Sequence, residues 1–329
     1  MKRASVRDRV RAIDAGEAVV GTHVLGQTPI IVTALGEIIV VDESDARVTL
    51  HDGAILDTAS DGTSLITGGD DGRVMRFSPK SGPSLIAEGR AWVDRVALSS
   101  NGGIAWSTGK IVHATDGKGE VRTLSLASSA SGLAFFPKGF RLAISHYMGA
   151  TLWFPNMTGA APQKLEWKGS HTGVEVSPDA RFVVTTMQES QLHGWRLEDG
   201  QHMRMSGYPA KVRSMSWTHG GKFLATSGSA EAILWPFSGK TGPMGQSPTM
   251  IAPSASAAMR VTTVAGHPQT EVVATGFTDG LILLARISDG AEILLREPDG
   301  DPISALAWSR DGKTFVFGTE GGKAGVASL

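Results

Sequence analysis

Side chains that could do chemistry are spread thinly along this chain of 329 residues. It contains no cysteine, and none of its serines stands in a Gly-x-Ser-x-Gly nucleophile elbow. Residues 238–241 read Ser-Gly-Lys-Thr, but the earlier glycine and the following helix of a phosphate-binding loop are missing. The nine histidines include no pair at metal-ligand spacing on one strand. We therefore predict a protein that is not an enzyme and that holds no cofactor.

The chain repeats itself about every 40 residues. Residues 174–179 read Val-Glu-Val-Ser-Pro-Asp, and residues 306–312 read Leu-Ala-Trp-Ser-Arg-Asp-Gly. Each is a short apolar run that ends in a turn. Comparable turns stand near positions 26, 60, 99, 136, 177, 218, 267 and 309. Self-similarity at this period is typical of propellers and solenoids.

Each repeat continues with two more apolar runs that a tight turn separates. Residues 64–68 are followed by Asp70-Asp71-Gly72 and then by residues 73–77, which is the turn chemistry of a β-hairpin. The same order recurs in residues 223–235 and 272–284. Together with the first run and a weaker last one, each repeat supplies four short antiparallel strands. Four such strands are one blade of a propeller.

These repeats resemble those of the WD-repeat family, and the resemblance covers nearly the whole chain. It rests on the Ser-Pro-Asp turn at 177–179, on the Asp-Gly turns at 71–72 and 279–280, and on a tryptophan that closes the third strand. The closing residues are Trp153, Trp195 and Trp235. The resemblance implies an all-β fold, a β-propeller of four-stranded blades. It also implies a non-catalytic scaffold that mediates protein-protein interaction through the top face or the rim of the propeller.

The buried polar set of the family is present at most once. In the family, a histidine before the first strand and a Trp-Asp after the third are tied together by hydrogen bonds. Here no tryptophan is followed by aspartate. Only His51 keeps the family's histidine position, with Asp71 as the matching acid. The resemblance therefore implies a structural hydrogen bond between His51 and Asp71.

Eight turns predict eight blades, with seven as the alternative, in a single domain over residues 1–329. The last repeat is one strand short, while residues 6–12 alternate between arginine and apolar residues. Such a strand suits the edge of a sheet. We predict that it pairs with residues 323–329 and closes the propeller. Residues 238–258 are rich in Gly, Pro and Ser, and we expect a loop insertion in the sixth unit.

Composition limits the classes of partner and compartment. No apolar run is long enough to span a membrane, and the start of the chain carries charges instead of the apolar core of a secretory signal. We expect a cytoplasmic protein, and the Ala- and Gly-rich repeats suggest a bacterial one. With 31 basic and 32 acidic residues, the net charge of −1 does not favour nucleic acid as a partner. The expected partners are proteins or peptides.

In WD-repeat propellers, the residues just before the first strand and at the end of the second surround the mouth of a central channel. The resemblance places these residues there: Asp94, Tyr147, Met187, Lys211, Arg213, Arg260 and Phe277. Arginine, tyrosine, methionine and phenylalanine are enriched in interface cores, so we predict a partner-binding surface. For Met187 and Phe277, packing between blades stays open. A propeller enzyme, or a metal site at the channel near His23, His146 or His171, is the alternative.

Overall fold

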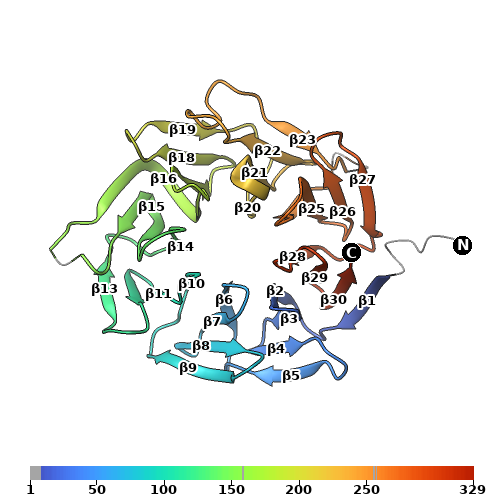
Figure 1. The fold of residues 1–329 in the computed structure, drawn as a ribbon, viewed down its shortest axis with the longest axis horizontal. Helices are drawn as coiled ribbons and strands as arrows, with labels where there is room; N and C mark the ends of the chain where they lie inside the picture. Colours follow the sequence, from blue (N-terminus) through green and yellow to red (C-terminus); the bar gives the residue numbers. More distant parts are fainter. Residues whose placement is uncertain (1–8, 158, 255, 257) are drawn as a thin grey trace, which may run out of the picture. The chain divides into compact units, whose positions relative to one another are not determined.

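The structure is a computed structural model that describes residues 9–157, 159–254, 256 and 258–329. The chain divides into two compact units, which we describe separately. Unit 1 comprises residues 1–49 and 212–329, and unit 2 comprises residues 50–211. The described residues form 30 strands, which Figure 1 labels in chain order. The extent of a single domain over residues 1–329 stays a prediction.

Unit 1 contains four antiparallel sheets of four strands each. The first holds β2 (Val19–Leu25), β3 (Thr28–Thr33), β4 (Glu37–Val40) and β5 (Ala46–Thr49). The second holds β20 (Met215–Trp217), β21 (Phe223–Thr226), β22 (Ala232–Pro236) and β23 (Thr249–Ile251), with the 3-10 helix η2 (His219–Gly221) after β20. The third holds β24 (Val261–Gly266), β25 (Val272–Phe277), β26 (Ile282–Arg286) and β27 (Glu292–Arg296). The fourth holds β28 (Ile303–Trp308), β29 (Thr314–Thr319), β30 (Lys323–Ser328) and β1 (Val10–Asp14).

Unit 2 contains three antiparallel sheets. The first holds β6 (Ile55–Ser60), β7 (Leu65–Gly69), β8 (Arg73–Ser78) and β9 (Gly82–Glu88). The second holds β10 (Arg95–Leu98), β11 (Ile104–Thr108), β12 (Ile111–Thr115) and β13 (Arg122–Ser125). The third has six strands: β14 (Gly132–Phe135), β15 (Leu142–Trp153), β16 (Gln163–Val176), β17 (Phe182–Met187), β18 (Leu192–Arg196) and β19 (His202–Met205).

The described residues therefore form an all-β propeller of seven sheets, and the prediction of eight blades is wrong. All eight predicted turns are present, since each follows one of β2, β6, β10, β14, β16, β20, β24 and β28. The fourth and fifth repeats, however, share one sheet because β16 is 14 residues long. Its first part pairs with β15, up to Ser170 opposite Tyr147, and its second part pairs with β17, from His171 opposite Met187 onward.

The N-terminal strand lies slightly later than its predicted range of 6–12, of which residues 6–8 are outside the described residues. β1 pairs with β30, with Val10 opposite Ala327 and Asp14 opposite Lys323. The sequence predicted this pairing of the N-terminal strand with residues 323–329. Arg11 faces solvent and its guanidinium lies 2.5 Å from Asp45 Oδ2. The closure of the propeller by this strand stays a prediction.

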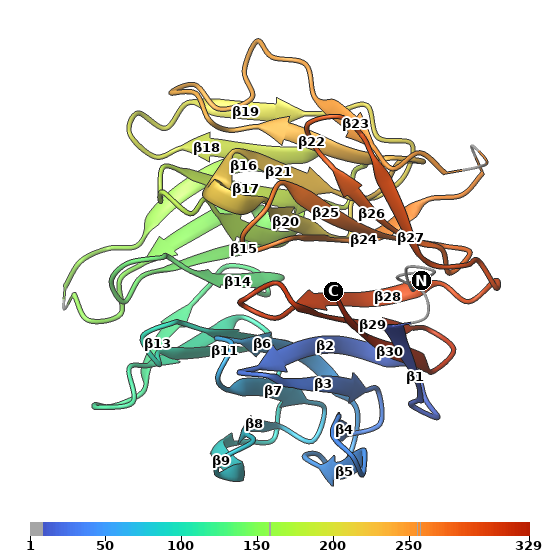
Figure 2. The same ribbon diagram turned by 45° about the vertical axis from the view of Figure 1, so that its right-hand side comes forward.

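Neighbouring sheets in each unit are joined through the starts of their first strands. In unit 1 the Thr262 hydroxyl donates to Ile303 O over 2.6 Å, and the Ser304 hydroxyl donates to Val19 O over 2.6 Å. Figure 2 shows the result in unit 1, where β28 lies beside β2. In unit 2 the Val96 N–H donates to Asp57 Oδ2 over 2.8 Å. These bonds set the first strands side by side, with their starting ends together.

Apolar side chains fill the space between neighbouring sheets. Phe315 and Leu284 lie in one such cluster of unit 1, and Val96 and Ile66 lie in one of unit 2. The Asp-Gly turn between β7 and β8 depends on its glycine, because Gly72 has φ +80° and an added Cβ would lie 2.2 Å from Gly89 O. The local turn chemistry thus determines where each hairpin reverses.

Part of the predicted loop insertion at 238–258 forms regular structure. Residues 249–251 are β23, which pairs with β22 so that Ile251 lies opposite Ala232. Residues 255 and 257 lie outside the described residues. Among the described residues no helix has both the length and the apolar character needed to span a membrane.

Candidate functional site

Two of the predicted partner-binding residues, Met187 and Phe277, are buried. Their side chains are 1% and 0% exposed, so they cannot contact a partner at the surface. Met187 ends β17 and Phe277 ends β25, and both strands are buried along nearly their whole length. Phe277 packs in the cluster that contains Val261 and Leu283. For these two residues the predicted surface position is wrong.

The other predicted residues have polar or exposed side chains. In unit 2, Tyr147 is 60% exposed, the Asp94 carboxylate accepts the Gly109 N–H over 2.5 Å, and Lys211 Nζ lies 2.9 Å from Gln188 Oε1. In unit 1, Arg213 is exposed and Arg260 is half-buried. Arg213 lies two residues before β20 begins, and Arg260 lies directly before β24.

The predicted hydrogen bond between His51 and Asp71 is present, and this prediction is confirmed. His51 Nδ1 lies 2.9 Å from Asp71 Oδ1, and Nε2 lies 2.7 Å from the Thr67 hydroxyl. Because a carboxylate only accepts, Nδ1–H donates to Asp71 and Nε2 accepts from Thr67. Burial would raise the pKa of Asp71, but the bonds from His51 and the Arg73 N–H hold that pKa below its ordinary value. The group is structural, since His51 is 2% exposed.

Five exposed apolar side chains lie at one end of the sheets of unit 2, where the first strands start. We call this surface the strand-start face. Its members and exposures are Leu56 (36%), Trp92 (62%), Ile111 (41%), Tyr147 (60%) and Met148 (47%).

The strand pairing places these residues at the same end. Leu56 lies at the start of β6, and Trp92 stands just before β10. The start of β10 pairs with the end of β11. Ile111, the first residue of β12, pairs with Thr108 at the end of β11 and so lies at the same end of the sheet. In the third sheet the start of β14 pairs with Ser145, two residues before Tyr147. The first strands of these sheets adjoin through the Asp57–Val96 bond and through Arg95 Nε, which lies 2.8 Å from Ser131 O.

A polar cavity of ≈530 Å³ lies among the first strands of unit 2. Its walls come from residues 57–60, 95–98, 131–135 and 172–175. Burial raises the pKa of Glu175 to about 7, and no described residue donates a hydrogen bond to its carboxyl group. Burial also raises the pKa of Asp57 to about 6, while the Val96 N–H and Arg95 act in the opposite direction. The cavity thus holds two carboxyl groups that titrate near neutral pH.

The histidines named for the metal alternative are engaged in other ways. His146 Nδ1 and Nε2 lie 2.8 Å from Tyr147 O and 2.8 Å from the Thr151 hydroxyl. His171 Nδ1 lies 2.7 Å from the Thr185 hydroxyl, and Nε2 lies 3.1 Å from Trp167 O. Burial lowers the pKa of His23 to about 4. Within the part of the chain that the structure describes, no group of three or more His, Asp or Glu could hold a metal ion.

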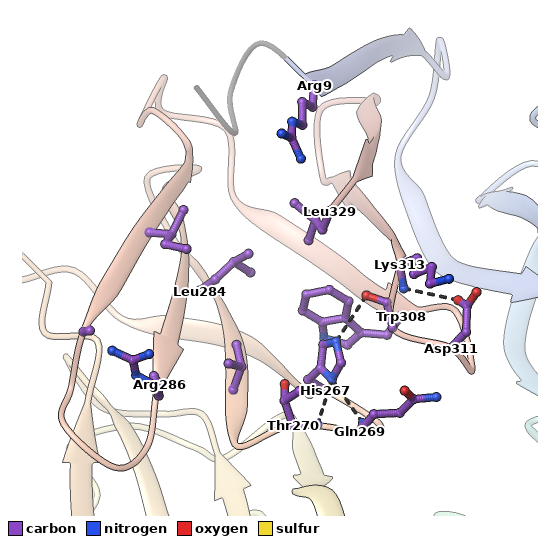
Figure 3. Close-up of a pocket in the computed structure, with 14 residues that line it drawn as sticks. Arg9, His267, Gln269, Thr270, Leu284, Arg286, Trp308, Asp311, Lys313 and Leu329 are labelled. Atoms are coloured by element: carbon purple, nitrogen blue, oxygen red, sulfur yellow. Dashed lines mark hydrogen bonds between the residues drawn. The ribbon is translucent and has the colours of Figure 1, made fainter. Parts of the chain in front are cut away.

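Unit 1 carries a groove of ≈650 Å³ between the sheet of β24–β27 and the sheet of β28–β30 and β1 (Figure 3). Val272, Leu284 and Ile293 line one wall, and Trp308 and Leu329 line the other. Ile293 lies on β27, the outer strand, where it pairs directly with Leu284 of β26. It is 49% exposed. The floor and walls are therefore mainly apolar.

Comparisons with known proteins identify a fold and no family. No protein-family model matches the sequence, and no curated protein matches it. The structure is similar to the crystal structure of the computationally designed Ika8 protein, with a TM-score of 0.76 and 18% sequence identity. The match covers 96% of this chain and 98% of that chain. At this identity the likeness concerns the fold alone.

Proposed function

We propose that this chain is a non-catalytic WD-repeat scaffold that binds a protein partner through the strand-start face of unit 2. The observation that carries the proposal is the gathering of five exposed apolar side chains at one end of neighbouring sheets. Large exposed apolar side chains are costly in water, and where several share one surface they mark interaction sites. A protein partner that covers Trp92 and Tyr147 would remove that cost.

The residue types on this face suit a protein interface. Trp92 and Tyr147 offer large rigid rings, and tryptophan and tyrosine are enriched among residues that dominate binding energy. The segment that carries Trp92 is held in place, because Asp94 accepts the Gly109 N–H and its own N–H donates to Ser107 O over 2.9 Å. Gly109 belongs to the turn that precedes Ile111. The two anchoring segments are therefore joined before a partner arrives, which lowers the ordering cost of binding.

Polar residues would surround these anchors. Asp94 and Lys211 of unit 2 keep their predicted role as partner contacts, with Lys211 oriented by Gln188. Arg213 and Arg260 precede β20 and β24 of unit 1, and for that unit, taken by itself, they stay proposed partner contacts. Charged groups around an apolar centre contribute mostly to association rate and specificity.

The test is affinity capture from the cells that express this chain, with the full chain as bait. We expect captured proteins to be lost when Trp92→Ser and Tyr147→Ser are combined, with an unchanged melting temperature. A matched control combines Leu85→Ser and Met157→Ser, which lie in the same unit and are 52% and 58% exposed. Equal loss in the control, or undiminished capture by the Trp92/Tyr147 variant, would contradict the proposal.

A further inference from the structure

We infer that the groove of unit 1 is a second docking site, separate from the strand-start face, and that it takes an acidic peptide segment with large apolar anchors. The inference rests on three properties of the groove: an apolar interior, a rigid floor and a cationic rim. Each property follows from contacts of described residues.

The interior offers space and apolar contact. Its ≈650 Å³ is within the range of pockets that hold several side chains. Leu284 on β26 and Ile293 on β27 are cross-strand neighbours and form a continuous apolar wall. Leu329, which follows β30, lies across the groove from Leu284 (Figure 3). One or two leucine, isoleucine or phenylalanine side chains would fill this space.

The floor consists of two rings that are held by hydrogen bonds. The Trp308 indole N–H donates to Ala265 O over 3.2 Å, and the ring centroid lies 4.7 Å from that of His267. His267 Nδ1 accepts the N–H groups of Gln269 and Thr270, as Figure 3 shows. Its Nε2 lies 3.2 Å from Gly312 O, so the ring is neutral and donates there. The ring polar groups are thus satisfied internally, and the floor presents apolar ring surface.

The rim of the groove carries three cations, Arg9, Arg286 and Lys313. Arg9 and Lys313 line the groove, are exposed, and form no ion pair within 4 Å of any described residue, although the Lys313 charge is among the causes that hold the pKa of Asp311 below its ordinary value. The third cation, Arg286, is neutralised by Asp289 over 2.6 Å. Asp311 is the one carboxylate side chain among the described lining residues. It already accepts the Ser309 hydroxyl over 2.6 Å and the Lys313 N–H over 3.2 Å.

This charge pattern selects the occupant. A segment with Asp or Glu beside its apolar anchors would place carboxylates near Arg9 and Lys313, whereas a basic segment would meet like charge. Because Arg9 precedes β1 and Lys313 precedes β29, the two cations stand at different points of the rim and would orient the segment in the groove (Figure 3).

The test is a selection of displayed random 12-residue peptides on the purified full chain, followed by fluorescence anisotropy with the selected peptides. We expect Asp and Glu beside Leu, Ile or Phe, and binding weakened about tenfold or more by Ile293→Ser and by Lys313→Glu. A peptide with one acid replaced by lysine should bind Lys313→Glu better than it binds the unchanged chain. Met250→Ser, 58% exposed in the same unit, and Lys110→Glu in unit 2 are the matched controls.

Three outcomes would overturn the inference. They are a selection without binders, selected peptides without acidic residues, and peptides that bind Ile293→Ser and Lys313→Glu as tightly as the unchanged chain. Peptides that instead depend on Trp92 and Tyr147 would also overturn it, while they would support the proposed function. The failures of the two proposals are therefore distinguishable.

Discussion

Glu175 provides a pH-dependent contribution to stability that can be measured. Its carboxyl group lines the polar cavity of unit 2, and burial raises the pKa from an ordinary 4.5 to about 7 in the folded state. No described residue donates a hydrogen bond to this carboxyl group that would compensate for its burial. Replacing this residue by glutamine keeps the shape and removes the charge.

The sign of the effect follows from proton linkage. Below pH 4.5 the carboxyl group is protonated in both the folded and the unfolded state, so it contributes nothing. Between pH 4.5 and 7 the folded chain keeps a proton that the unfolded chain releases, and the free energy of unfolding falls as pH rises. Above pH 7 the full penalty is present. A difference of 7 − 4.5 = 2.5 pKa units at about 1.4 kcal/mol each gives a penalty of about 3.5 kcal/mol at most.

Urea unfolding followed by tryptophan fluorescence at pH 4 to 8.5 measures this penalty. We expect Glu175→Gln to match the unchanged chain near pH 4 and to exceed its stability by about 1–3 kcal/mol at pH 8, since water in the cavity screens part of the penalty. Glu120→Gln, at an 88% exposed side chain of the same unit, is the control and should leave the profile unchanged. Parallel profiles for Glu175→Gln and the unchanged chain would refute the reasoning.

Three further perturbations test the fold. His51→Ala and Asp71→Ala should each cost about 1–3 kcal/mol in urea unfolding, and the double variant should lose less than the sum; additive losses would show that the hydrogen bond contributes nothing. Gly72→Ala should destabilise the chain by about 2 kcal/mol or more, because the added Cβ would clash with the backbone. Gly82→Ala, at φ +68° with nothing within 4 Å of the added Cβ, should cost only about 1 kcal/mol. Equal costs would show that the clash does not destabilise the Gly72→Ala variant. Deleting residues 1–14 should lower the melting temperature and promote self-association by exposing β30 as an edge; an unchanged melting curve and a monomer on size-exclusion chromatography would be incompatible with a stabilising role for β1.

The positions of the first strands could be predicted from the sequence because turn chemistry is local. Each predicted turn depends on a few residues such as Ser177-Pro178-Asp179, and each follows a strand in the structure. The His51–Asp71 bond was predicted from the resemblance to WD repeats, in which a histidine at this position is tied to an acid of the same repeat. Its third member, Thr67, carries no distinguishing signal, because threonine also occurs in β3, β11, β17, β21, β25 and β29.

Sheet continuity and side-chain direction could not be predicted in this way. The length of β16 depends on its pairing with two different neighbours, which no single turn reveals. Met187 and Phe277 end second strands, where one residue of register decides between surface and core. Trp92 was missed because it lies in the connection between β9 and β10, outside every apolar run. An aromatic residue in such a connection, two positions before the predicted contact Asp94, was the available signal.

Photo-crosslinking from the strand-start face tests the central claim most directly. A photoreactive phenylalanine analogue would replace Trp92 or Tyr147 in the full chain, with positions 85 and 157 as controls in the same unit. Irradiation in the cells that express the chain should yield a discrete protein adduct from positions 92 and 147 and none from the controls. Adducts from the control positions only, or none from positions 92 and 147, would contradict the proposal that this face binds a protein partner.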